Sequence, residues 1–239
     1  MAAISVGQGQ CLAVMAGDHT VVIDCGATGS VKNAGETAAS YLCSRGRYSV
    51  DALILTHFHN DHINGAEALM ELVSVKKLII PADAEYDEKT MKTLLSCAER
   101  NETEIEYVTE DSIYQWGNIR ALLFAPFTDG NANERCITGD VSVNGYDMIV
   151  TADISKKEER ILAEKLVPGS AELLIVPHHG SKYSGDADFL RSLGADTAII
   201  SVGYNTYGHP TQEILERLDE CGYNVYRTDT DGTVEIRIR

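Results

Sequence analysis

Residues 53–66 read LILTHFHNDHINGA, and in this stretch an apolar run leads directly into three histidines and an aspartate within six positions. His57 and His59 are two apart on a chain that should still be extended, so both imidazoles point the same way and can bind one metal ion. Asp61 and His62 follow at the first turn of the next predicted helix and can reach a second ion. A carboxylate beside neutral imidazoles suits zinc, manganese or iron. The competing interpretation, a solvated histidine-rich loop, is disfavoured by the buried strand that precedes these residues.

Short apolar runs alternate with helical patterns and turn signals along the chain, which predicts a mixed α/β fold. The predicted strands, several of them apolar enough to be buried on both faces, cover residues 21–23, 52–55, 78–80, 121–124, 148–150, 173–176 and 198–202.

Helical spacing of apolar residues recurs over 63–73 and 91–98. A capping box formed by Ser155 and Glu158 opens a third helix, and Thr211 opens a fourth. The region from 107 to 151 reads as consecutive strands with tight turns, and residues 129–134 are polar enough to form a mobile loop.

Composition limits the class of protein. The 239 residues contain no linker, low-complexity tract or clean repeat, so we expect a single domain over residues 1–239. No apolar run approaches the roughly 18 residues that span a bilayer, and no secretory signal is visible, so the chain as given is expected to be soluble. The six cysteines form no CxxC pair, which favours buried free thiols. A formal charge of −16 argues against broad electrostatic capture of nucleic acid.

Three further predicted strands end in residues that can bind metals: DMIVTAD, ELLIVPHHGS and TAIISVGYNTYGHP. Ligand sites in α/β sheets gather beyond the carboxyl ends of strands, so we expect these loops to converge with the first. Asp153 is favoured over Asp140 as a site residue because it ends a strand just before the capped helix. If the chain is still extended at His178 and His179, their side chains point in different directions. We favour His179 as the metal ligand and His178 as its neighbour.

The THFHNDH motif resembles the HxHxDH signature of the metallo-β-lactamase superfamily. The segments SVGQGQCLAV, VVIDCG, TADIS, VPHHGSKYS, SVGYNTYGHP and YRTDTDGTVEI resemble, in the same order, the metallo-β-lactamase-like domain of the ComEC/Rec2 family of DNA-internalisation competence proteins. This resemblance covers essentially the whole chain. It implies a four-layer αββα sandwich with a metal site at the edge shared by the two sheets.

The resemblance also implies roles for individual residues. Two divalent ions, zinc or manganese, are expected, with Asp153 bridging them. The implied metal ligands are His57, His59, Asp61, His62, Asp153 and His179. The implied catalytic residues are Asp61, Asp153 and His209, the last as an acid or phosphate contact on the substrate side. The implied substrate contacts are His178, Ser181, Ser184, Asn205 and Tyr207.

The chain departs from the superfamily pattern at three points. No histidine lies between His62 and His178, although the superfamily usually supplies a third histidine to the first ion. The ComEC-like group commonly lacks this histidine too, so water and substrate would complete the coordination of that ion. Gln10 stands where the family often has an acidic residue, and Ala152 replaces a glycine.

These roles imply a dinuclear metal-dependent hydrolase, and our first hypothesis is phosphodiester hydrolysis of DNA in competence-type DNA uptake. The alternatives are hydrolysis of a small phosphodiester or another ester, and a metal-supported DNA-uptake accessory module without turnover. The expected partners are DNA or another phosphodiester and, for a domain excised from a longer protein, a membrane DNA-uptake channel. Oligomeric state stays open, as does the choice between a cytoplasmic and a membrane-tethered, extracytoplasmic location.

Overall fold

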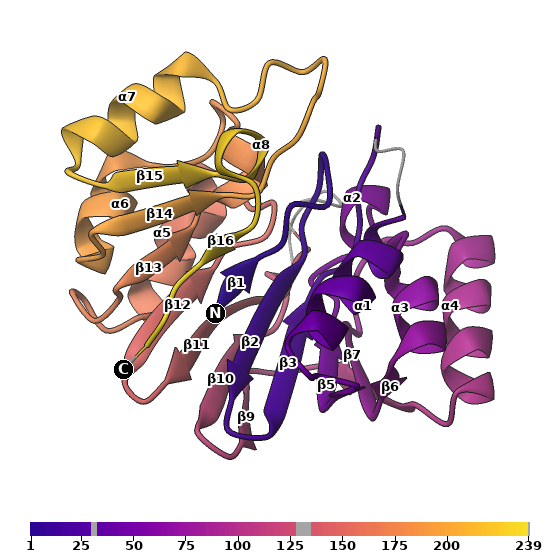
Figure 1. The fold of residues 1–239 in the computed structure, drawn as a ribbon. Helices are drawn as coiled ribbons and strands as arrows, with labels where there is room; N and C mark the ends of the chain where they lie inside the picture. Colours follow the sequence, from indigo (N-terminus) through magenta and orange to yellow (C-terminus); the bar gives the residue numbers. More distant parts are fainter. Residues whose placement is uncertain (30–32, 128–134, 239) are drawn as a thin grey trace.

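The computed structural model describes residues 1–29, 33–127 and 135–238, so the predicted loop at 129–134 lies outside the described residues. Two seven-stranded sheets dominate the fold (Figure 1). The first runs from edge to edge through β16 (Val234–Glu235), β1 (Ala2–Ala3), β2 (Leu12–Ala16), β3 (His19–Ile23), β5 (Ala52–Ile54), β7 (Lys77–Pro81) and β8 (Glu104–Val108). The second runs through β15 (Asn224–Arg227), β14 (Thr197–Ile200), β13 (Leu173–Ile175), β12 (Tyr146–Val150), β11 (Thr138–Val143), β10 (Ile119–Phe124) and β9 (Ser112–Trp116). A small parallel pair joins β4 (Ser49–Val50) to β6 (Ser74–Val75).

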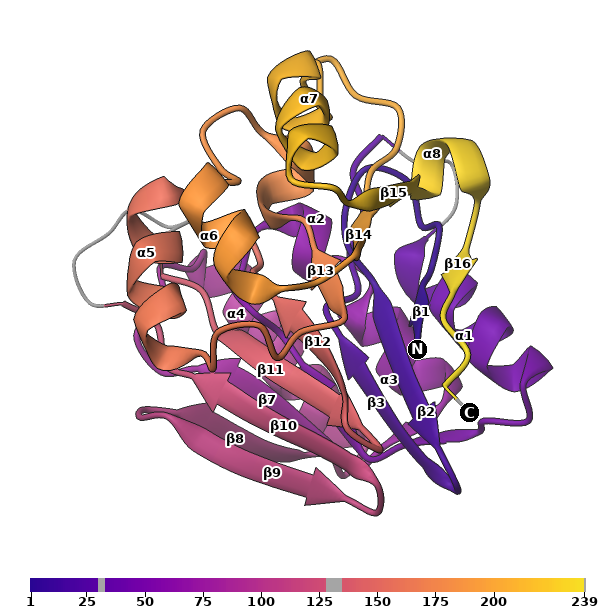
Figure 2. The same ribbon diagram turned by 90° about the vertical axis from the view of Figure 1, so that its left-hand side faces the viewer.

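Helices cover the outer face of each sheet. The first sheet carries α1 (Ala34–Ser44), α3 (Ala66–Leu72) and α4 (Glu88–Arg100), and the second carries α5 (Lys156–Lys165), α6 (Ala187–Leu193) and α7 (Gln212–Glu220). Figure 2 shows the second set of helices in front of its sheet. The short elements α2 (Asn60–Ile63), η1 (Pro177–Gly180) and α8 (Thr228–Asp231) lie in the connections. The predicted four-layer αββα sandwich is therefore confirmed.

Three apolar clusters hold the layers together. Alternation along β3 shows how the sequence sorts them, because Val21 and Ile23 pack between the two sheets while Val22 packs under the helices. Ile54 and Leu53 divide in the same way on β5. Each such side chain is fully buried or nearly so, which stabilises the fold by about 1.5–3 kcal/mol relative to an exposed one.

All seven predicted strands are present, but the helix predicted over 63–73 is not continuous. It breaks at Asn64, whose side chain accepts from Ala27 N and donates to Ala27 O, and at Gly65. A Cβ on Gly65 would lie 2.3 Å from the backbone nitrogen of Gly35 in α1. The break therefore lets α3 turn and pack closely against α1.

Two predictions from composition concern membranes and thiols. Among the residues that the structure describes, no helix has the length and apolar character needed to cross a bilayer. All six cysteines are free, and four of them are buried.

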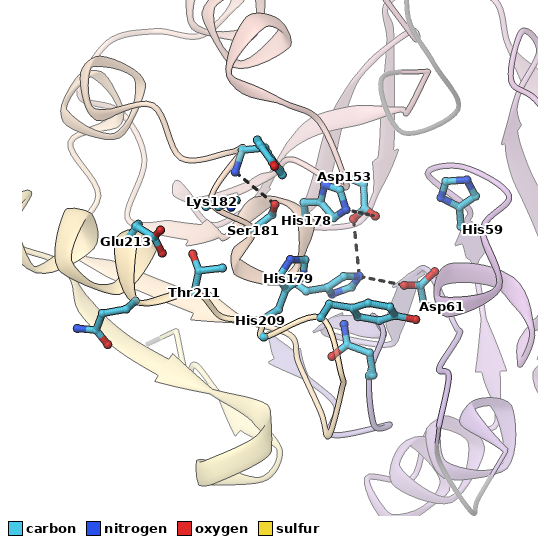
Figure 3. Close-up of a pocket in the computed structure, with 15 residues that line it drawn as sticks. His59, Asp61, Asp153, His178, His179, Ser181, Lys182, His209, Thr211 and Glu213 are labelled. Atoms are coloured by element: carbon cyan, nitrogen blue, oxygen red, sulfur yellow. Dashed lines mark hydrogen bonds and ion pairs between the residues drawn. The ribbon is translucent and has the colours of Figure 1, made fainter.

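The site lies where parallel strands end. β3, β5 and β7 are parallel in the first sheet, as are β12, β13, β14 and β15 in the second. The loops that follow β5, β12, β13 and β14 bring their polar residues together at one edge of the sandwich (Figure 3).

Candidate metal centre

The histidine-rich loop starts where β5 ends and is held from below by a buried carboxylate. Asp24 accepts hydrogen bonds from Thr56 N (2.7 Å) and Thr56 Oγ1 (2.9 Å). The next residue, His57, is 1% exposed, and its Nε2 lies 3.2 Å from His59 Nδ1. The two imidazoles therefore converge, as expected for residues two apart on extended chain.

Two glycines allow the second half of this loop to approach the first sheet. A Cβ on Gly9 would lie 2.4 Å from the carbonyl oxygen of Asp61, and one on Gly26 would lie 2.5 Å from the backbone of His62. In that space Gln10 N donates to Asp61 O (2.9 Å) and Cys25 N donates to His62 O (2.7 Å). The glycines near the N-terminus thus position Asp61 and His62.

Asp153 lies between the two sets of histidines. Its Oδ1 is 3.2 Å from His62 Nε2 and 3.7 Å from His179 Nε2, and its Oδ2 is 3.8 Å from His57 Nε2. The other candidate, Asp140, lies inside β11 and is paired with a residue on each neighbouring strand. Of the two candidates, Asp153 is therefore the one that lies against the histidines.

The two consecutive histidines adopt an unexpected backbone. The chain is not extended there: His178 and His179 both have φ of 52°, in the left-handed region. His179 Nδ1 donates to Ser201 O (2.7 Å), so its Nε2 faces Asp61 Oδ2 at 3.5 Å (Figure 3). His178 is partly exposed, with Nε2 3.8 Å from Asp153 Oδ2. The side chains do diverge, but the cause is the tight turn that starts at Pro177 rather than strand alternation.

These side chains form two groups that could each hold a metal ion. Within each group the candidate ligand atoms lie within 4.8 Å of one another. The first group is His57, His59 and Asp153, and the second is Asp61, His62 and His179.

The donor atoms of the centre fit divalent cations. Among the described residues, His62 Nε2, His179 Nε2 and Asp153 Oδ1 are buried and have no hydrogen-bond partner. His62 Nε2 and Asp153 Oδ1 approach to 3.2 Å, but without the alignment of a hydrogen bond. Buried polar atoms nearly always have partners, so three unpartnered atoms in one place indicate a missing ligand. Imidazole nitrogens beside carboxylate oxygens suit zinc or manganese.

The pKa shifts of Asp153 and His62 also favour a cation at this centre. Burial opposes the ionisation of Asp153, but the imidazoles of His62 and His179 hold the pKa of this carboxyl well below its usual range. Burial also opposes the protonation of His62, yet Asp153 and Asp24 raise its pKa well above the ordinary value. The two carboxylates therefore favour a positive charge beside them, which a divalent cation can supply.

Asp24 is a residue of the candidate centre that we did not predict. It is fully buried, and its Oδ2 accepts from His62 Nδ1 at 2.8 Å, which leaves His62 Nε2 to face Asp153. Gln10 Nε2 donates to the same oxygen (2.8 Å). Carboxylates that orient a ligating histidine are common around metal sites. The signal was present in VVIDCG, where an aspartate directly follows a buried strand.

The centre opens into a cleft of 640 Å³. Predicted site residues that line it are His59, Asp61, Asp153, His178, His179, Ser181, Tyr207 and His209. Lys182 lines it as well, and Figure 3 shows it across the cleft from His59. The imidazole of His209 packs edge to face against that of His178, with ring centres 5.7 Å apart.

Two predicted substrate contacts have other roles. Ser184 is fully buried, and its hydroxyl reaches only the carbonyls of Pro177 and Ser181. The Asn205 side chain donates to His209 O (2.7 Å) and accepts from Tyr207 N, so it closes its own loop. Neither residue lines the cleft; both shape the loops that do.

Comparison with known proteins places this centre in a family. A family model described as "Metallo-beta-lactamase superfamily" matches residues 4–119, which include the whole histidine-rich loop. The chain is 34% identical over 202 residues to ComE operon protein 3 of Bacillus subtilis (strain 168), covering 83% of this chain and 26% of that protein.

The chain belongs to the metallo-β-lactamase superfamily. Competence protein ComA of Neisseria gonorrhoeae is 27% identical over 235 residues, covering 96% of this chain and 31% of that protein. The metallo-β-lactamase fold protein YhfI from Bacillus subtilis superposes with a TM-score of 0.65 at 15% identity, covering 98% of this chain and 97% of that one. The chain therefore has the fold of the metallo-β-lactamase hydrolases and is related to competence proteins. It spans about a quarter to a third of the length of the curated relatives it matches.

The three departures of this chain from the superfamily pattern lie at the metal centre. With no histidine between His62 and His178, the first group has two imidazoles and the Asp153 carboxylate. Gln10, where an acid is common, donates to Asp24 instead of adding a second buried carboxylate beside it. Ala152 has φ of 50°, the left-handed conformation that favours the glycine it replaces.

Proposed function

We propose that the chain is a dinuclear metal-dependent phosphodiesterase that cleaves DNA. The observation that carries this proposal is the convergence of three unpartnered buried atoms, on His62, His179 and Asp153, at the floor of an open cleft among the described residues. We also propose that residues 1–239 form a single domain, because β1 pairs with β16 and the second metal group combines loops from both sheets.

The proposed ligands follow the two groups. His57, His59 and Asp153 would hold the first ion. Asp61, His62 and His179 would hold the second. Asp153 faces both groups, with Oδ1 towards His62 and His179 and Oδ2 towards His57, so both ions could share this carboxylate. Either zinc or manganese suits this set of donors.

The residues around the ions would bind and orient a phosphodiester. When bound, two divalent ions would supply Lewis acidity for in-line attack by a water molecule at phosphorus, which forms one P–O bond as the ester P–O bond breaks. Burial and the neighbouring His178 lower the pKa of His209, so this imidazole is neutral near pH 7 and donates one N–H. A bound phosphate would favour its protonated form, and His209 would then give its proton to the departing oxygen. His178 and Lys182 face the same space and would steady the phosphate oxygens.

DNA as the substrate is supported by the relatives rather than by the cleft. ComE operon protein 3 and Competence protein ComA match most of this chain, and each is roughly three times as long as the chain. For the longer proteins in which such a domain occurs, we extend the proposal to a role in competence-type DNA uptake and to association with a membrane channel.

The first test combines metal analysis with two substrates. We expect purified protein to bind up to two Zn²⁺ or Mn²⁺ per chain and to hydrolyse both DNA and bis-p-nitrophenyl phosphate. Asp61→Ala should lower turnover by at least about a hundredfold, since it removes one ligand of a two-metal site. Asp18→Ala, an exposed aspartate in the turn between β2 and β3, is the matched control and should behave as wild type.

Three outcomes would count against the proposal. Bound metal without turnover of either substrate would favour the non-catalytic accessory module. Full activity of Asp61→Ala would contradict a two-metal mechanism. Absence of bound metal under all conditions would overturn the assignment of His57, His59 and His62 as ligands.

A further inference from the structure

The hollow at the metal centre continues on both sides of His59. On one side is the 640 Å³ cleft that contains His178, Lys182 and His209. On the other is a second cavity of 560 Å³, lined by Phe58, His59, Tyr86 and residues at the start of α4. Because His59 lines both, a ligand that crosses the centre can enter both cavities. A small phosphodiester would occupy only one.

Tyrosine rings stand open in each of these cavities. Tyr183 and Tyr207, in the cleft, have exposed fractions of 69% and 68%. Tyr86, in the second cavity, is 51% exposed. Large aromatic faces left open beside a functional site are typical of surfaces that bind flat, apolar groups.

Neighbouring rings contact two of these tyrosines, Tyr207 and Tyr86. The ring centre of Tyr207 lies 6.1 Å from that of His209, which in turn lies 5.7 Å from that of His178. A series of rings therefore leads outward from Asp153 to the solvent. Across the centre, Tyr86 packs edge to face against Phe58 at 5.9 Å.

The charges of the two cavities disfavour recognition through phosphates alone. Among the described residues that line them, Lys182 is the sole lysine or arginine, and its Nζ lies 5.2 Å from the ring centre of Tyr183. The second cavity instead contains Glu85 and Asp87. A nucleic acid bound there gains more from its bases than from its backbone.

We propose that Tyr86, Tyr183 and Tyr207 are base-stacking sites that select unpaired DNA strands. A single strand would cross the centre with bases on Tyr183 and Tyr207 on one side and on Tyr86 on the other. In a duplex both faces of each base are already covered by stacking, so it cannot use these rings. This inference rests on the proposed function for the reaction, but it concerns how the strand is held.

The test compares three ligands of equal length by fluorescence anisotropy, with Asp61→Ala protein so that no strand is cut. The ligands are a labelled oligothymidylate, an abasic oligomer and a duplex. We expect the oligothymidylate to bind at least about tenfold more tightly than either of the others, because stacking of one base is worth a factor of roughly 5 to 150.

Added alanine substitutions locate the effect. Tyr207→Ala and Tyr86→Ala should each reduce the preference for bases by about five- to tenfold or more, and Tyr207→Phe should retain it because the ring remains. Tyr48→Ala, which removes a tyrosine of the same 69% exposure outside both cavities, is the matched control and should leave all affinities unchanged.

The outcomes separate this inference from the proposed function. Equal binding of the oligothymidylate and the abasic oligomer, or an effect of Tyr48→Ala equal to that of Tyr207→Ala, would overturn base stacking even if wild-type protein hydrolyses bis-p-nitrophenyl phosphate. A base preference that depends on Tyr207 and Tyr86, in a wild-type protein that cleaves neither substrate, would support the stacking sites and overturn the hydrolase.

Discussion

Asp24 lies behind the proposed metal ligands and is not among them. Its two oxygens hold the start of the histidine-rich loop through Thr56 and orient His62 through Nδ1. Its conformation is also unusual, with φ of 56° on a non-glycine residue. Such a conformation costs about 1–2 kcal/mol and is retained only where the surroundings determine it.

Asp24→Asn should therefore weaken metal binding more than its distance from the cleft suggests. An amide at this position presents an N–H to groups that already donate, so His62 loses its fixed orientation. We expect a 10- to 100-fold loss of zinc or manganese affinity, the usual effect of losing a carboxylate behind a ligating histidine. Chelator competition measures this, with Asp18→Asn as the control. Unchanged affinity would mean that His62 is oriented by Asp153 alone.

Ala152 is a residue whose backbone favours a different side chain. With φ of 50° it sits in the left-handed region directly before Asp153. Ala152→Gly should raise the free energy of unfolding by up to about 1 kcal/mol, because the relief of strain exceeds the added entropy of the unfolded chain.

Urea unfolding followed by circular dichroism measures the change. Ala163→Gly, in the interior of α5, is the matched control, and it should lower stability by about 1 kcal/mol, since its backbone is helical. A destabilisation of equal size at both positions would show that no strain is stored at Ala152.

At the scale of elements, α5 fixes the loop that forms one wall of the cleft. The carboxylate of Glu159 accepts from Gly185 N (2.5 Å) and Asp186 N (2.6 Å), and Arg217 of α7 donates to Ser184 O (2.8 Å). Lys182 and Tyr183, which directly precede Ser184 in the chain, line the cleft. Two helices thus position a loop that has no regular structure of its own.

The same contact makes stability depend on pH. Burial raises the pKa of Glu159 to about 7, although the two backbone N–H groups favour the ionised form. In the unfolded chain this carboxyl loses its proton near pH 4.5. The folded state therefore keeps a proton that the unfolded state has lost, and stability falls as the pH rises from about 4.5 to 7.

Glu159→Gln should remove this dependence. Between pH 4.5 and pH 8 we expect wild-type protein to lose up to about 3 kcal/mol more of its unfolding free energy than the variant does. Glu164→Gln, on an exposed position of the same helix, should follow wild type. If the unfolding free energies of wild type and Glu159→Gln change in parallel with pH, Glu159 is not the cause of the pH dependence.

Elements and site differ in how far the sequence predicts them. Strand positions follow from apolar alternation, and the spacing of His57 and His59 places both imidazoles on one side of the chain. The roles of His178 and Asp24 do not follow from local pattern. The first depends on a left-handed turn that only the packed loop stabilises, and the second depends on a contact between residues 38 apart in sequence.

At the scale of the whole molecule, both sheets are needed to form the centre. The second metal group combines Asp61 and His62 after β5 of one sheet with His179 after β13 of the other. Such a meeting of distant loops can be expected once the fold class is known, because parallel strands end at a common edge. The distances within the centre depend on tertiary contacts such as the close approach at Gly9 and Gly26.

The net charge of −16 gives the last prediction. A protein that binds nucleic acid through many lysines and arginines releases counterions, so its affinity falls steeply as salt is added. The slope of log affinity against log salt concentration changes by about −0.7 for each phosphate neutralised on a single strand. In the described part of both cavities, Lys182 is the only lysine or arginine. Added salt also screens repulsion between DNA and the acidic body, which offsets part of the loss.

We therefore expect a logarithmic slope between 0 and about −2 when an oligothymidylate binds Asp61→Ala protein, which does not cut the strand, between 50 and 400 mM salt with Mn²⁺ present. Anisotropy titrations at several salt concentrations measure it. Lys182→Ala should make the slope shallower by about 0.7, while Lys89→Ala, on the exposed face of α4, should leave it unchanged. A slope of about −4 or steeper would require a cationic surface outside the two cavities, and the strand would then be held by its phosphates rather than by stacking on tyrosines.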